Sequence, residues 1–72
     1  MIPADWSIVH SSNVDAVKYD AGKSELHVRF KNGGYYVYAG VPPEEAENLH
    51  GDPSPGGYLR SNIVGTYQYR RA

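Results

Sequence analysis

The sequence predicts an α+β domain, with a three-stranded antiparallel meander covered on one face by two short C-terminal helices. Two short glycine-containing turns, AGKS and KNGG, separate three segments that are rich in β-branched and aromatic residues. A proline pair then ends the third segment, and two segments with helix-start signals follow it. At 72 residues the chain is long enough for a single domain, which we expect to span 1–72 with its core at about 11–71.

The three predicted strands span 14–20, 25–30 and 35–41. In the middle segment, ELHVRF, apolar and polar residues alternate, so one face of that strand is apolar and the other is polar. The short turns between the segments favour antiparallel neighbours. We therefore expect a sheet with one apolar face that the helices must cover.

The first predicted helix begins at the proline pair of PPEEAENLH, with two glutamates at the positive end of the helix dipole. Ala46 and Leu49 are expected to face the sheet. The second predicted helix covers 54–63 and begins with a serine at the N-cap and a proline at the first helical position. Leu59 and Ile63, four residues apart, would share its buried face.

The two ends of the chain give weaker patterns. The final segment, GTYQYRRA, is interpreted as either a short strand or an ordered tail. Near the N-terminus we expect Trp6 to be a packing anchor, and Ser11 and Ser12 to lead into the sheet.

Composition narrows the classes of function. Seven Lys and Arg residues nearly balance eight Asp and Glu residues, so no overall field attracts nucleic acid or anionic lipid. The chain has no cysteine, which excludes disulfides and thiolate metal sites and fits a cytoplasmic location. No segment has the pattern of a secretory signal or a membrane span. Because a chain this short buries only about 60% of its unfolded surface, we expect a homo-oligomer.

The spacing of reactive residues predicts neither an enzyme nor a metal or cofactor site. His10, His27 and His50 have no second ligand at helical or hairpin spacing. Ser54 lies in DPSPGG, which lacks the strand-to-helix elbow of a hydrolase serine. The segment AGKS lacks the upstream glycine of a phosphate-binding loop.

Two features instead indicate binding, and the first is aromatic. The chain has seven tyrosines and one tryptophan against one phenylalanine, a preference that suits interfaces and base stacking. In GGYYVYAG the strand period places Tyr36 and Tyr38 on one face and Tyr35 on the other. The pair either packs under the helices or forms a ligand or partner surface. We expect the pair to pack there, which leaves Tyr35 as the first candidate on the open face.

The second feature is the helix start SPGG, which Tyr58, Arg60 and Asn62 follow, with two arginines near the chain end. Backbone N–H groups, glycines that permit close approach and a guanidinium favour a phosphate or carboxylate. The alternative is an ordinary helix start with solvated arginines. The predicted ligand-binding residues are Tyr35, Tyr36, Tyr38, Ser54, Gly56, Gly57, Tyr58, Arg60, Asn62 and Arg70.

The order of these motifs resembles the KTSC domain over about 11–71 of the chain. The motifs are SSNVDAVKYD, Gly-x-Tyr-x-Tyr followed by VP, SPGGYLRSNI and YQYRR. The matching residues are Ser11, Ser12, Tyr19, Asp20, Tyr36, Tyr38, Val41, Pro42, Ser54, Gly56, Tyr58, Ile63 and Tyr67. Lys18 stands where the family usually has glycine, and Val64 stands where many members have a basic residue.

The KTSC domain is a short domain found alone in bacteria and phages and at the C-terminus of some lysyl-tRNA synthetases. The resemblance implies RNA binding as a candidate role, and it implies no catalytic activity and no cofactor. Because Val64 replaces the basic residue of many family members, any RNA-binding role that depends on that basic residue is weakened.

Together the sequence predicts a non-catalytic binding module for a small phosphate-bearing nucleotide, or for RNA. The few cations argue against a long polyanion, because such a ligand needs many phosphate contacts. One specific version, given the family's presence in phages, is a protein that sequesters a signalling nucleotide. The alternative is a protein-interaction or self-assembly module with no small ligand, in which the tyrosines join subunits.

Overall fold

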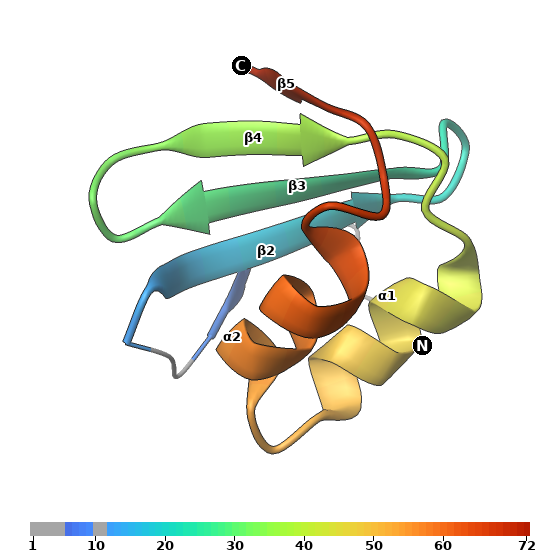
Figure 1. Cartoon of the computed structure of the whole chain (residues 1–72). Helices are drawn as coiled ribbons and strands as arrows, with labels where there is room; N and C mark the ends of the chain where they lie inside the picture. The colour runs from blue at the N-terminus through green and yellow to red at the C-terminus, as the bar shows by residue number, and fades with distance from the viewer. Residues whose placement is uncertain (1–5, 10–11) are drawn as a thin grey trace.

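A computed structural model of the chain describes residues 6–9 and 12–72, so His10 and Ser11 lie outside the described residues. Five antiparallel strands form one sheet in chain order, β1-β2-β3-β4-β5, and the helices follow β4 in the chain (Figure 1). The elements are β1 (Ser7–Ile8), β2 (Val14–Asp20), β3 (Glu25–Phe30), β4 (Tyr35–Tyr38), α1 (Pro43–Gly51), α2 (Pro55–Tyr58), η1 (Leu59–Ile63) and β5 (Tyr69–Arg71).

The α+β class, the antiparallel sheet and the two helices are confirmed, but the predicted number of strands is wrong. The sheet has five strands instead of three, because β1 pairs with β2 at one edge and β5 pairs with β4 at the other. These strands have only two and three residues, too few to show an alternating pattern in the sequence. Their pairing with neighbouring strands defines them, and that pairing depends on tertiary contacts that a local sequence pattern does not show.

The β3–β4 hairpin turn depends on the residues of KNGG. Gly33 has φ of 95°, a conformation that favours glycine, and its N–H donates to the Phe30 carbonyl over 3.0 Å. The Asn32 side chain accepts a hydrogen bond from the Gly34 N–H at 2.9 Å. This turn fixes the register in which Val28 faces Tyr36 and His27 faces Val37.

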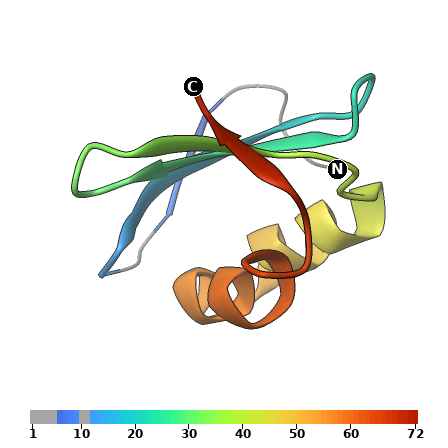
Figure 2. The ribbon, with the colours of Figure 1, turned by 45° about the horizontal axis from the view of Figure 1, so that its top comes forward.

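Both helices pack on the same face of the sheet, as predicted (Figure 2). The second helix is continuous from α2 into η1 and ends in a π-helical turn, in which the Val64 N–H donates to the Leu59 carbonyl at 2.9 Å. Ser54 occupies the N-cap position with proline after it, but its side chain makes no capping hydrogen bond. Its backbone N–H donates instead to Asp52 Oδ1 at 2.8 Å.

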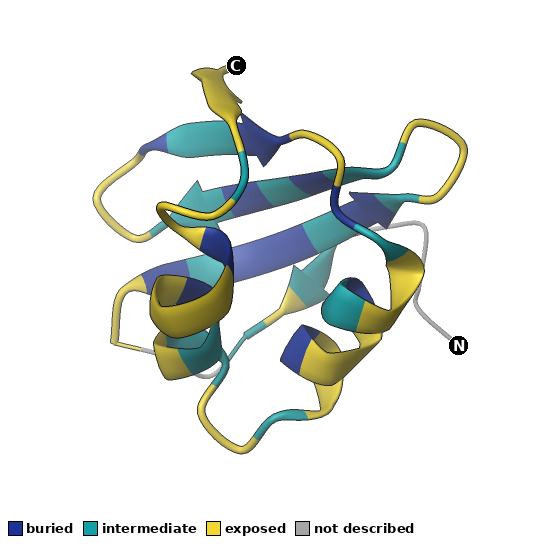
Figure 3. Ribbon diagram, turned by 45° about the vertical axis from the view of Figure 1, so that its right-hand side comes forward, coloured by how far each residue is buried: buried dark blue, intermediate teal, exposed yellow. Residues whose placement is uncertain are grey.

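The hydrophobic core lies between the sheet and the helices. The helices bury the faces that they turn towards the sheet and expose their outward faces (Figure 3). Tyr38 belongs to this core and Tyr36 is partly buried against it, so both rings lie on the helix side of the sheet, as expected. The core residues are Val14, Val17, Tyr19, Leu26, Val28, Tyr38, Val41, Ala46, Leu49, Leu59 and Ile63.

The Tyr19 hydroxyl donates a 2.6 Å hydrogen bond to the Val41 carbonyl inside the core, which joins β2 to the segment between β4 and α1. Tyr19→Phe leaves that buried carbonyl without its donor. We expect the free energy of unfolding to fall by about 1–3 kcal/mol, measured by urea denaturation. As a control, Tyr69→Phe removes a hydroxyl from an exposed ring and should change stability by less than about 0.5 kcal/mol. Equal stability of Tyr19→Phe and the wild type would contradict a structural role for this bond.

Candidate functional site

A surface groove of about 540 Å³ lies between the sheet and the second helix, on the side of the sheet that the helices cover. Rings from β3, β4 and β5 form its sheet side, and Leu59, Arg60 and Val64 form its helix side. Lys31 and Asn32 of the β3–β4 turn also line it. The groove therefore combines residues that lie far apart in the sequence.

Four aromatic rings in a row line the sheet side of the groove, and we call them the aromatic wall: Phe30, Tyr36, Tyr69 and Tyr38. The centroids of neighbouring rings are 5.5 Å apart for Phe30 and Tyr36, 5.5 Å for Tyr36 and Tyr69, and 5.8 Å for Tyr69 and Tyr38. The first two pairs meet edge to face. The rings support one another, so the wall is a pre-formed apolar surface.

The charged groups at the groove are all cationic among the described residues. Lys31 and Arg60 line it, and no described carboxylate does. Neither cation has an ion-pair partner in the part of the chain that the structure describes. The Arg71 guanidinium lies over the Tyr36 ring, 5.7 Å from its centroid. The groove is therefore suited to an anion attached to an apolar, planar group.

A second, more polar hollow of about 370 Å³ adjoins the groove at the start of α2. Ser54, Gly56, Gly57 and Arg60 line it, and Gly56 and Arg60 also line the groove. A Cβ atom on Gly57 would lie 3.0 Å from Ser54 Oγ. Gly57 thus makes room for the Ser54 side chain of its own chain, a reason for glycine that needs no ligand.

Tyr58 and Asn62, two of the predicted ligand-binding residues, lie outside the groove and belong to the packing of the helices. The Tyr58 hydroxyl donates to Glu45 Oε1, and the Tyr67 hydroxyl donates to Glu45 Oε2 at 3.2 Å. The hydrogen bond to the Glu45 carboxylate raises the pKa of Tyr58. The Asn62 side chain donates to the Tyr58 carbonyl at 3.2 Å. This arrangement holds α1 to the second helix.

Tyr35 lies on the opposite side of the sheet, which we call the open face because none of the described helices covers it (Figure 2). Its hydroxyl is 2.9 Å from His27 Nδ1, and its ring meets the Trp6 ring edge to face with centroids 5.3 Å apart. Burial is the main cause that lowers the pKa of His27. The Tyr35 side chain is therefore already engaged in contacts within the chain.

Arg70 also lies on the open face, where its Nη1 donates to Glu25 Oε2 at 3.0 Å. That hydrogen bond lowers the pKa of Glu25. Its neighbour Arg71 pairs with Tyr36 and so lies on the helix side. Of the predicted site, the groove and its adjoining hollow bring together Tyr36, Tyr38, Ser54, Gly56, Gly57 and Arg60. The structure does not bring Tyr35, Tyr58, Asn62 or Arg70 into that site.

Long side chains seal the open face in place of a helix. Ala16 and Val37 are 0% and 1% exposed there. The Trp6 ring extends across this face, with the Lys18 ammonium 5.1 Å and the Arg29 guanidinium 4.7 Å from its centroid. Trp6 is therefore a packing anchor, as predicted.

The predicted site did not include Phe30, Lys31 or Tyr69, the two rings and the cation of the groove on which its binding character depends. Phe30 could have been found from the strand period, because it shares a face with Val28. No pattern in the sequence indicated Tyr69, because the final segment could be either a short strand or an ordered tail.

Residues 6–9 and 12–72 form neither a metal-binding cluster nor a membrane-spanning helix. Within these ranges no three His, Asp or Glu side chains gather closely enough to hold a metal ion. No helix in the same ranges is long and apolar enough to cross a membrane.

Comparisons with known proteins agree with the order of motifs in the chain. The sequence model of the KTSC domain matches residues 10–69. A protein of Tsukamurella paurometabola is 37% identical over 55 residues, which are 76% of this chain and 82% of that protein. The crystal structure of a KTSC domain protein from Yersinia pestis is similar with a TM-score of 0.91 and 28% sequence identity. That similarity covers 94% of this chain and 96% of the other.

The open face gives a test of Trp6. Trp6→Ala removes the ring that meets Tyr35 edge to face and contacts Lys18 and Arg29, and we expect the free energy of unfolding to fall by about 2 kcal/mol in urea denaturation. The matched control is Ile8→Ala on β1, because that side chain is 70% exposed and its loss should change stability by less than about 0.5 kcal/mol. Similar effects of the two substitutions would mean that Trp6 does not seal this face.

Proposed function

The chain belongs to the KTSC domain family, and for this member we propose a non-catalytic binding role with a small phosphate-bearing nucleotide as ligand. The observation that carries the proposal is that the aromatic wall and two unpaired cations, Lys31 and Arg60, line one groove. A nucleotide is the common metabolite class that combines a planar ring with a charged phosphate. The planar ring and the phosphate of such a ligand would each contact a different set of residues in the groove.

The ring of the ligand would lie against the aromatic wall. Stacking of a base on an aromatic side chain contributes roughly 1–3 kcal/mol and tolerates different bases. Tyr69 is 64% exposed, so part of the wall is open to an incoming ring. A groove of about 540 Å³ is within the range of small-ligand sites in proteins.

The phosphate would be held by Arg60 and Lys31 at the rim of the groove. A guanidinium donates two parallel hydrogen bonds to phosphate oxygens, and such charge-assisted bonds are about twice as strong as neutral ones. We assign the phosphate to these side chains in preference to the helix start, because α2 has four residues and Pro55 has no N–H to donate.

A mononucleotide-sized ligand fits this charge pattern better than RNA does. A polyanion gains affinity from many phosphate contacts, whereas the chain carries a net charge of −1 and only two cations, Lys31 and Arg60, line this groove. A module that binds without catalysis would sequester its ligand. We extend the proposal to a signalling nucleotide in a bacterial or phage setting.

The test is calorimetric titration of the wild-type chain with a panel of nucleotides. We expect Arg60→Ala to weaken the tightest nucleotide by about 10-fold or more, because one charge-assisted phosphate contact is lost. The matched control is Arg70→Ala, since that arginine pairs with Glu25 on the open face and its loss should leave the affinity unchanged. Equal affinities of Arg60→Ala and the wild type would contradict the placement of the phosphate.

Two other results would redirect the assignment. Binding of a single-stranded RNA oligomer much more tightly than any mononucleotide would replace the small ligand by RNA. If no nucleotide binds at high micromolar concentration, the nucleotide proposal fails. A concentration-dependent increase of mass in light scattering that Tyr69→Ala abolishes would then support self-assembly through the exposed rim of the groove.

A further inference from the structure

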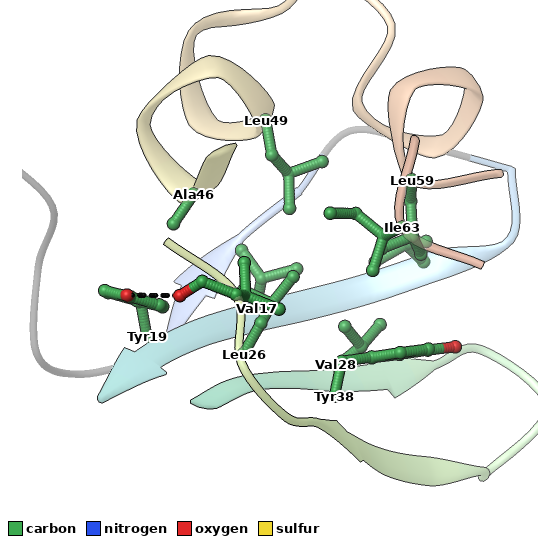
Figure 4. Close-up of a cluster of buried hydrophobic side chains, with 11 residues drawn as sticks. Val17, Tyr19, Leu26, Val28, Tyr38, Ala46, Leu49, Leu59 and Ile63 are labelled. Atoms are coloured by element: carbon green, nitrogen blue, oxygen red, sulfur yellow. Dashed lines mark hydrogen bonds between the residues drawn. The ribbon is translucent and has the colours of Figure 1, made fainter. Parts of the chain in front are cut away.

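Tyr38 differs from the other core tyrosine in what its hydroxyl does. Tyr19 and Tyr38 are 5% and 4% exposed, so both rings are buried. The Tyr19 hydroxyl donates to the Val41 carbonyl, whereas the Tyr38 hydroxyl has no hydrogen-bond partner in the described part of the chain. Figure 4 shows the hydroxyl at the end of the Tyr38 ring that is turned away from Tyr19 and α1.

The Tyr38 hydroxyl faces the groove. A tyrosine hydroxyl sealed in the core without a partner is strongly unfavourable. No described side chain has a fully occluded polar atom without a partner, so the Tyr38 oxygen keeps access to solvent. Tyr38 lines the groove, and the groove is therefore the route by which that oxygen is reached.

We propose that the Tyr38 hydroxyl is a specificity-determining contact that reads the hydrogen-bonding edge of the ligand's base. This inference rests on the proposed function and assigns the part of the groove that meets the base. The contact would discriminate among nucleotides by the arrangement of hydrogen-bond donors and acceptors on that edge of the base.

The chemistry of the group suits this role. Burial raises the pKa of Tyr38, and the nearby Tyr36 and Tyr69 hydroxyls raise it further. The hydroxyl is therefore protonated at neutral pH, where it both donates and accepts a hydrogen bond. A contact made by such a buried group discriminates well, because a ligand that leaves it unpaired pays the full cost of its desolvation.

The arrangement of the groove separates the base from the phosphate. Tyr69 is the neighbour of Tyr38 along the aromatic wall, and Tyr36 follows beyond Tyr69; both offer ring surfaces for stacking. Arg60 and Lys31 are the charged groups and are both exposed. A ligand whose phosphate reaches these cations would place its base deeper, towards the buried Tyr38.

The experiment compares Tyr38→Phe with the wild type in titrations with AMP, GMP, CMP and UMP. The substitution keeps the ring and removes no hydrogen bond within the described chain, so urea denaturation should show unchanged stability. We expect about a 10-fold loss of affinity for the tightest nucleotide, and we expect the affinities for the four nucleotides to differ less from one another than in the wild type. Tyr19→Phe is the matched control, and it should lower stability while it leaves the affinities and the differences among them unchanged.

The outcomes separate this inference from the proposed function. If nucleotides bind and Tyr38→Phe binds them as the wild type does, the role of Tyr38 is overturned and the groove proposal stands. An equal fractional loss for all four bases would also overturn it, because the contact would then be to the sugar or phosphate. If the wild type binds none of the four, this assignment fails, and the wider nucleotide panel decides whether the proposed function fails too.

Discussion

A single sheet has two faces to protect from water, and this chain has helices for only one of them. On the helix side, α1 and the second helix bury Leu49, Leu59 and Ile63 against the sheet. On the open face, Trp6 and the stems of long polar side chains must do the same for Ala16 and Val37. This division decides which aromatic residues are occupied by packing and which remain available to a ligand.

The groove follows from incomplete cover on the helix side. The second helix lies over part of the sheet, and the groove opens beside it, where Tyr69 is exposed, Phe30 and Tyr36 are partly buried and Tyr38 is buried. Because β5 lies next to β4, Tyr69 meets both Tyr36 and Tyr38, and Arg71 lies over Tyr36. The short C-terminal strand therefore completes the aromatic wall. On the open face, by contrast, Tyr35, His27 and Trp6 are engaged with one another.

Local patterns in the sequence predicted the parts of the fold that local forces determine. The strand period separated Tyr35 from Tyr36 and Tyr38, and the structure places them on opposite faces as expected. Alternation of apolar and polar residues cannot be recognised in strands as short as β1 and β5, so these two strands were not counted in the predicted sheet. The predicted place of Arg70 in the site was wrong for the same reason, because Arg70 lies on the open face once β5 pairs with β4, opposite its neighbour Arg71.

Nuclear magnetic resonance would test the account most directly, with the tightest nucleotide of the panel added to isotope-labelled wild-type chain. We expect the largest backbone amide shift changes at Tyr36, Tyr38 and Arg60, around the groove. The amides of His27 and Tyr35 belong to the open face and should change little. The largest changes at these open-face residues, with the groove unaffected, would contradict the claim that the uncovered part of the helix side is the binding site.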